Sequence, residues 1–188
     1  LETAAALAES QRRLSLLVKR SPIGVIVWDQ DRRAREWNPA AAEIFGHSEA
    51  EALGMPVSAI VPERFHGELA ALGDLLYSGR AVEPVRRPNV TRDGREIVCE
   101  WHNTPLIDDD GRVMGVASMV RDVTAEVMAQ TDLEQREEDL RLITDALPAL
   151  IGYVDEATLY RFCNAQHGRW LGVPPERVRG RTLEEVLG

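Results

Sequence analysis

The spacing of apolar residues along the first twenty positions predicts an amphipathic helix. Residues 3–19 carry apolar side chains at helical intervals, with alanines and charged residues between them. These apolar positions are Leu7, Leu14, Leu17 and Val18. Pro22 predicts the end of the helix, because proline disfavours helical backbone in the residue before it.

Two strands and a series of helices are predicted next. Residues 24–28 and 34–37 are strand-like runs on either side of a polar turn. Asn38 and Pro39 are typical of the N-cap and first position of a helix, and Gly46 is typical of a helix end. Further helices are predicted at about 48–53, 57–61 and 62–78.

Three more strands are predicted around two turn dipeptides, Asp93-Gly94 and Asp110-Gly111, which are typical of tight hairpins. The strands are expected at 85–91, 95–107 and 112–123. Alternation along the middle strand puts Ile97, Cys99, Trp101 and Asn103 on one face, and Val98, Glu100, His102 and Thr104 on the other. This order of elements predicts an α+β domain with a five-stranded antiparallel sheet and helices on one face.

The chain also contains an internal repeat. Residues 21–62 align without a gap on residues 147–188, at an offset of 126. The identical pairs are Pro22/Pro148, Asp29/Asp155, Arg35/Arg161, Asn38/Asn164, Gly46/Gly172 and Gly54/Gly180. The order of strand, turn, strand and short helix repeats as well. We therefore predict one complete domain followed by the first part of a second.

The segment between the two copies is predicted to be helical. Leu133, Leu140 and Leu147 are seven residues apart, and Ala129, Arg136 and Ile143 occupy the alternate seam position. This repeat is typical of a short parallel coiled coil, although Arg136 weakens its middle layer. The alternative interpretation is a lone amphipathic helix that packs on its own domain.

Composition places the chain among soluble globular proteins. Its 188 residues are 44% hydrophobic and 28% charged, with a net charge of −9. No apolar stretch is long enough to cross a membrane, so no membrane contact is expected from this segment. No secretory signal pattern is present, which predicts a cytoplasmic segment cut from a longer protein.

The charge and cysteine patterns exclude several functions. Residues 125–147 hold seven acidic residues and two arginines, so they carry most of the net charge on a solvated face. Clustered basic residues are missing, which argues against a nucleic-acid partner. Cys99 and Cys163 belong to no metal-binding motif, so neither a zinc site nor a disulfide scaffold is expected. No catalytic motif occurs either, so any enzyme activity is expected in another domain.

At this point the sequence resembles the PAS domain family. The resemblance rests on the order of several local motifs and covers about residues 20–124, and again 147–188. These motifs are Trp37-Asn38-Pro39-Ala40-Ala41, Phe45-Gly46, Thr91-Arg92-Asp93-Gly94, Asp110-Gly111 and Asp122-Val123-Thr124. It implies an N-terminal helix at 1–20, a PAS domain at 21–124, a helical linker at 125–146 and an incomplete second PAS domain at 147–188.

The resemblance also implies a ligand pocket between the inner face of the sheet and the helices. The expected lining is Ile26, Trp28, Ile44, Leu72, Leu76, Asn89, Cys99, Trp101, Asn103, Val116, Ser118 and Val120. A small organic ligand would suit such a pocket. The alternative is that Trp28 and Trp101 fill the space completely.

Specific cofactors of the family fit the residues poorly. Flavin-binding members have a reactive cysteine on a helix and amides that face the ring, whereas no cysteine occurs between residues 38 and 98. Asn89 stands at one amide position, but Cys99 and Val120 stand at two others. Haem-binding members use a histidine on the long helix, where His66 lies about one turn too early. We therefore expect no cofactor and no metal, and haem bound by His66 is a minor alternative.

Two functional hypotheses remain open. In the first, the resemblance implies a sensory module that dimerises and passes a ligand or redox signal through Asp122, Val123 and Thr124 into the helix that follows. The effector domain would lie on the same polypeptide, as a histidine kinase or a cyclic-dinucleotide enzyme. In the second, a ligand-free scaffold holds two chains together. The expected dimer contacts in either case are Leu7, Leu14, Leu17, Leu133, Leu140, Ile143 and Leu147.

Overall fold

A computed structural model describes the backbone of residues 2–187 and the side chains of residues 9–187. The chain divides into two compact units, Leu1–Val127 and Met128–Gly188. The first unit begins with helix α1 (Glu2–Lys19), as the apolar spacing predicts. The side chain of Leu7 lies outside the described residues, and those of Leu14 and Leu17 are exposed.

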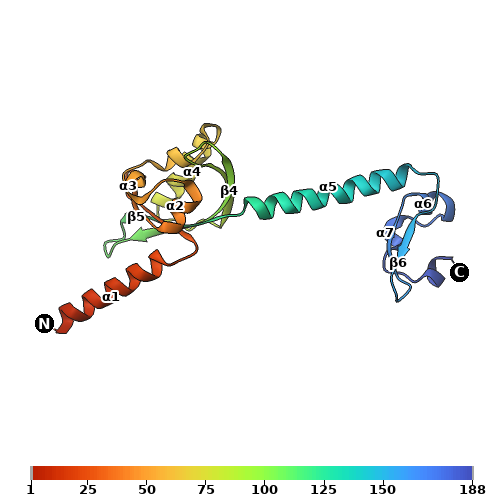
Figure 1. The fold of residues 1–188 in the computed structure, drawn as a ribbon, viewed down its shortest axis with the longest axis horizontal. Helices are drawn as coiled ribbons and strands as arrows, with labels where there is room; N and C mark the ends of the chain where they lie inside the picture. Colours follow the sequence, from red (N-terminus) through yellow and green to blue (C-terminus); the bar gives the residue numbers. More distant parts are fainter. Residues whose placement is uncertain (1, 188) are drawn as a thin grey trace. The chain divides into compact units, whose positions relative to one another are not determined.

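The first unit is built on a five-stranded antiparallel sheet with the order β2-β1-β5-β4-β3 (Figure 1). Its strands are β1 (Gly24–Trp28), β2 (Ala34–Trp37), β3 (Val85–Val90), β4 (Glu96–Ile107) and β5 (Val113–Asp122). The predicted sheet is therefore confirmed. β5 pairs with both β1 and β4, so a displacement of β5 would also move these two neighbouring strands.

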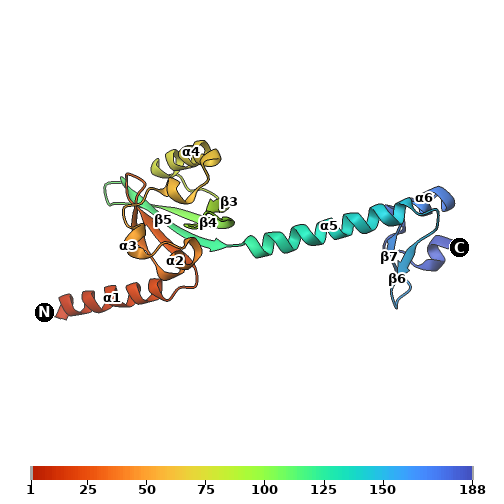
Figure 2. The ribbon, with the colours of Figure 1, turned by 45° about the horizontal axis from the view of Figure 1, so that its top comes forward.

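Short helices between β2 and β3 pack on one face of this sheet (Figure 2). They are α2 (Pro39–Phe45), α3 (Glu49–Ala52), the 3₁₀ turns η1 (Val57–Ile60) and η2 (Glu63–Phe65), and α4 (His66–Tyr77). Phe45 of α2 stacks on Trp101 of β4, with ring centroids 6.0 Å apart. Apolar contacts of this kind join helices and sheet into one core.

The alternation predicted for β4 is confirmed. Ile97, Cys99 and Trp101 are buried against the helices, whereas His102 and Thr104 are exposed on the opposite face. A strand that is buried on one side and solvated on the other has this period of two. The sheet therefore has one inner face, towards the helices, and one outer face.

Helix α5 (Thr124–Ala146) follows β5 directly. The second unit continues with the paired strands β6 (Gly152–Val154) and β7 (Tyr160–Cys163) and with α6 (Gln166–Leu171), α7 (Pro175–Val178) and α8 (Leu183–Leu187). Tyr160, Cys163 and Val178 form its small core. Leu150, Tyr153 and Trp170 remain exposed in this unit.

The internal repeat is visible in the backbone. Arg32 and Thr158, which are 126 residues apart, both have a positive φ, at 59° and 61°. Asp29 and Asp155 each accept two backbone N–H bonds and one arginine side-chain bond, at the same relative positions. The same local sequence pattern therefore builds the same hairpin turn twice.

Candidate functional site

A cavity of about 80 Å³ lies in the first unit between the inner face of the sheet and helix α4. Its lining is mostly apolar, with a few polar groups. The residues expected to line a pocket that do lie on its wall are Trp28, Leu72, Leu76, Asn89, Trp101, Asn103, Val116 and Ser118. The two large indole rings therefore do not fill the space.

One wall of the cavity contains a chain of hydrogen bonds that starts at an indole. Trp28 Nε1 donates to Ser118 Oγ at 3.0 Å, and Ser118 Oγ lies 2.7 Å from Asn103 Oδ1. Because an indole N–H only donates, Ser118 accepts from Trp28 and gives its own proton to Asn103. The Asn103 amide must then present its oxygen to Ser118, which leaves Nδ2 as a donor.

A second indole fixes a second amide. Trp101 Nε1 donates to Asn89 Oδ1 at 2.9 Å, and Asn89 Nδ2 donates to the backbone oxygen of Ile60 at 2.8 Å. Asn89 is almost fully buried, so both halves of its amide need these partners. The link from β4 through β3 to η1 holds this side of the cavity in one shape.

Four of the expected lining residues lie elsewhere. Ile26, Cys99 and Val120 are buried in the core of the first unit, and Ile44 packs against that core from α2. None of these four is on the wall of the cavity. The expectation that these four line the pocket is therefore wrong for this cavity: Ile26, Cys99 and Val120 share the inner face of the sheet with wall residues but lie at other positions along their strands.

Ten wall residues were not expected from the sequence, and those with a polar or charged side chain are Arg32, Tyr77 and Arg87. Arg87 lies two residues before Asn89 on β3, so the alternation that places Asn89 on the inner face also places Arg87 there. Arg32 reaches the cavity from the tight turn between β1 and β2, and its guanidinium lies 5.5 Å from the centroid of the Tyr77 ring. Its position depends on tertiary packing, for which the local sequence carries no signal.

The thiol of Cys99 has low reactivity in the folded chain. Burial raises the pKa of its thiol to about 12, and the negative charge of Asp122 acts in the same direction. Burial also raises the pKa of Cys163. Since the thiolate is the reactive form of cysteine, neither thiol is suited to rapid redox chemistry.

This environment leads to a testable prediction about thiol reactivity. In the Cys163→Ser variant, iodoacetamide at pH 8 is expected to modify native Cys99 at least about 100-fold more slowly than Cys99 in the urea-unfolded chain, because little thiolate forms at this pH. Mass spectrometry of timed samples gives both rates. Equal rates in the two states would show that Cys99 is open to solvent and available to sense redox changes.

The described residues offer no obvious metal or haem site. Groups of three or more metal-ligating side chains are absent from residues 9–187. His66 Nε2 lies 2.9 Å from the Val61 oxygen and 3.2 Å from the Ser58 oxygen, and His66 is not on the cavity wall. An engineered cavity of about 150 Å³ holds benzene. The present cavity is therefore too small, in this state, for the three fused rings of a flavin or for haem.

The residues expected to relay a signal join the end of the sheet to α5. Thr124 Oγ1 donates to Asp122 Oδ1 and accepts from Val98 N, which lies 2.9 Å away. Thr124 N also donates to Asp122 Oδ1, and the buried Val123 donates its N–H to the Val98 oxygen. The first turn of α5 is therefore attached to β4 as well as to β5.

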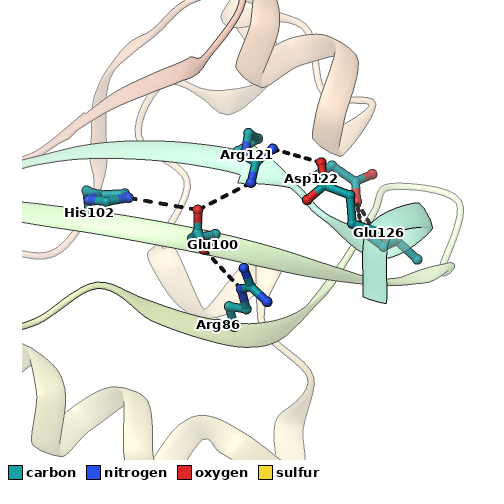
Figure 3. Close-up of polar contacts among 7 residues, drawn as sticks. Arg86, Glu100, His102, Arg121, Asp122 and Glu126 are labelled. Carbon is teal, nitrogen blue, oxygen red and sulfur yellow. Dashed lines mark hydrogen bonds and ion pairs between the residues drawn. The ribbon is translucent and has the colours of Figure 1, made fainter. Parts of the chain in front are cut away.

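A network of charged residues on the outer face links the same elements (Figure 3). Glu100 of β4 lies between Arg86 of β3 and Arg121 of β5, with N···O distances of 3.0 and 3.5 Å. Arg121 also pairs with Glu126 in the first turn of α5 at 2.8 Å, and His102 lies 4.0 Å from Glu100. The hydrogen bond from Arg86 is the main cause that lowers the pKa of Glu100, and the positive charges of Arg86 and Arg121 act in the same direction.

The residues expected at a coiled-coil seam are exposed in the single chain. Leu133 is 53% exposed, and Leu140 and Ile143 are each 61% exposed. Leu147 is also exposed. Apolar side chains on an otherwise charged helix favour association with another surface. Within residues 2–187, no helix is long and apolar enough to cross a bilayer.

Comparison with known families agrees with this architecture. A sequence profile described as the PAS fold matches residues 18–127 and 144–188. The chain belongs to the PAS family. The two matched ranges lie on either side of most of α5.

Individual relatives agree with the PAS assignment. The chain is 24% identical over 187 residues to the sensor histidine kinase TmoS of Ectopseudomonas mendocina. This alignment covers 92% of the present chain and only 19% of TmoS. The PAS domain of a protein from Colwellia psychrerythraea has a TM-score of 0.56 at 16% identity, over 61% of this chain and 98% of that chain. An RNA-binding light-oxygen-voltage receptor has a TM-score of 0.61 at 26% identity, over 68% of this chain and 37% of that chain.

Proposed function

We propose that this chain is the sensory and relay segment of a larger signalling protein. A small molecule in the cavity would shift β5, and the shift would change the position of α5 at Thr124. The observation that carries this proposal is the double role of β5: Val116 and Ser118 lie on the cavity wall, and the strand ends at Asp122, which bonds Thr124. Wall and relay therefore belong to one strand.

The energy required for such a relay is small. A ligand shifts an equilibrium only by its difference in affinity for the two states. A coupling of about 1–3 kcal/mol is typical of allosteric proteins. Loss or gain of one or two hydrogen bonds around Thr124 is of this size, because each contributes about 1 kcal/mol.

The output domain is proposed to be a histidine kinase on the same polypeptide, and catalysis belongs to that domain. The similarity to TmoS favours this output over a cyclic-dinucleotide enzyme. The free, buried thiols Cys99 and Cys163 agree with the reducing conditions of the cytoplasm, where we place the segment.

The active form is proposed to be a homodimer. The exposed Leu133, Leu140 and Ile143 of α5 form a stripe that a second copy of α5 would cover in a parallel coiled coil. Leu14 and Leu17 of α1 add a second exposed apolar stripe. A ligand-free scaffold would use the same contacts, so dimerisation alone does not distinguish it from a sensor.

A test of the relay needs no knowledge of the ligand. In the full-length protein, Leu72→Phe is expected to change output activity about fivefold or more, because the larger ring occupies the cavity as a ligand would. The change should disappear when Thr124→Pro is added. Proline removes both the N–H and the hydroxyl that bond Asp122, yet the first position of a helix tolerates it.

Thr104→Val provides the control for this test. Thr104 is an exposed threonine on the outer face of β4, so its substitution should leave the effect of Leu72→Phe intact. An equal effect of Leu72→Phe with and without Thr124→Pro would show that the signal does not pass through Thr124. No effect of Leu72→Phe in any background would favour the scaffold.

A further inference from the structure

A buried donor without a partner lies beside the cavity. Arg87 Nε is inaccessible to solvent and has no hydrogen-bond partner within the described residues. Buried polar atoms in native proteins are almost always satisfied, so such an atom indicates a missing ligand, ion or water. Arg87 is also on the cavity wall, but Nε itself has no accessible surface, so a ligand in the cavity reaches this atom only if the side chain turns towards it.

The rest of the Arg87 side chain is held in place. Its Nη1 atom donates to Glu68 Oε2 at 2.8 Å, and Glu68 belongs to the exposed side of α4. This ion pair fixes the guanidinium between β3 and α4 and uses only part of its donors. A guanidinium has five N–H groups, and its Nε edge suits an oxygen of a carboxylate.

The electrostatics of the wall favour an anion. Two arginines, Arg32 and Arg87, are on the wall, and no aspartate or glutamate is. The acidic partner of Arg32 is Asp74, at 2.6 Å, and it points to solvent on α4 with 76% of its side chain exposed. Each arginine is paired with a carboxylate, but both of these acidic partners are outside the lining of the cavity, which contains positive side chains and no negative one.

Asn103 supplies a second free donor on the same wall. Because its Oδ1 accepts from Ser118, its Nδ2 group is left as a donor, and it donates to no other described residue. Asn89, in contrast, uses both ends of its amide within the protein. The two side-chain atoms without a partner, Arg87 Nε and Asn103 Nδ2, are both donors, so they suit a ligand that accepts hydrogen bonds.

We infer that the cavity binds a short-chain monocarboxylate such as acetate or propionate. This inference rests on the proposed function, because it names the ligand class of the same site. The carboxylate would accept from the Arg87 guanidinium, turned towards the cavity, and its alkyl end would contact Leu72, Leu76 and Val116. The volume of about 80 Å³ is roughly half that of a cavity that holds benzene, which sets the limit at about three to five heavy atoms.

Saturation-transfer NMR and isothermal titration of the 188-residue chain test this inference. Propionate is expected to bind with a dissociation constant of about 1 mM or tighter. Propanamide has the same number of heavy atoms and no charge, and it should bind at least about 10-fold more weakly, because charge-assisted hydrogen bonds are the stronger ones. Arg87→Gln should weaken propionate binding by a similar factor.

Arg86→Gln is the matched control. Arg86 is the neighbour of Arg87, and its substitution removes the same charge from the outer face, where Arg86 pairs with Glu100. It should leave propionate binding unchanged. Equal binding of propionate and propanamide, an unchanged affinity in Arg87→Gln, or no binding of propionate would each overturn the inference. The relay through Thr124 is tested without any ligand, so the proposed function would fail or stand separately.

Discussion

The substitution Gly115→Ala is expected to lower the free energy of unfolding of the first unit by about 3 kcal/mol, as severe overpacking does. Gly115 lies on β5 beside Trp28 of β1. A Cβ atom at position 115 would lie 2.2 Å from the backbone oxygen of Trp28. A backbone atom in a sheet cannot rotate away, so β1 and β5 must separate. Urea unfolding followed by far-UV circular dichroism measures the loss.

Gly67→Ala is the control for this prediction. No heavy atom lies within 4 Å of a Cβ built at Gly67, which is in the first turn of α4. Alanine there should be neutral or should stabilise the chain by about 0.5–1 kcal/mol, because it favours helix over the unfolded state. A Gly115→Ala variant as stable as the wild type would contradict the close approach of Trp28.

Local signals explain why the elements of the fold could be predicted. The hairpin dipeptides Asp93-Gly94 and Asp110-Gly111 and the Asn38-Pro39 helix start each act within a few residues. The structure places Gly94 and Gly111 in the left-handed region, at φ of 82° and 79°. Backbone conformations that only a few residue types tolerate are therefore readable from the sequence.

The cavity was only partly predictable, since it depends on distant residues. Strand alternation assigned Trp28, Trp101 and Ser118 to the inner face, where they line the cavity. The same alternation placed Ile26 and Val120 on that face too, although they are not on the cavity wall. Which inner-face residue reaches the wall depends on helices that are tens of residues away in the chain. The volume of the cavity depends on side-chain rotamers, which the sequence does not specify.

The repeat carries a second strong prediction, which concerns Asn38. Its Oδ1 atom accepts from Val25 N at 2.8 Å and from Ala41 N at 2.9 Å, and its Nδ2 atom donates to the oxygens of Val18 and Ile23, both at 3.0 Å. One side chain therefore connects the end of α1, the first strand and the start of α2. Asn38 is buried, so water cannot replace these bonds.

Asn38→Ala is expected to lower the free energy of unfolding of the first unit by about 3 kcal/mol, because it removes an N-cap and leaves buried backbone groups unsatisfied. Urea unfolding gives the value, and Gln30→Ala, which removes one hydrogen bond from an exposed side chain, should cost about 1 kcal/mol or less. Asn38→Asp should fall between them. Its carboxylate still accepts from Val25 and Ala41 but faces two backbone oxygens that it cannot donate to.

Asn164 makes three of the four equivalent bonds in the second unit, without the N-cap bond, and the consequence there is larger. Its Oδ1 atom accepts from Ile151 N at 3.1 Å, and its Nδ2 atom donates to the oxygens of Thr144 and Ala149 at 2.7 and 2.8 Å. Thr144 lies in the last turn of α5. The amide therefore holds the end of the relay helix against the second unit, as Asn38 holds the end of α1 in the first.

Asn164→Ala is expected to remove about 2–3 kcal/mol from a much smaller structure, because it leaves backbone groups in the second unit without their partners. The core of the second unit contains only three buried apolar side chains within the described residues, Tyr160, Cys163 and Val178. Small cores have little stability to lose. We expect hydrogen exchange at β6 and β7 to approach the rate of an unfolded chain in this variant. Wild-type protection of those strands would show that the Asn164 amide contributes little to the attachment of α5.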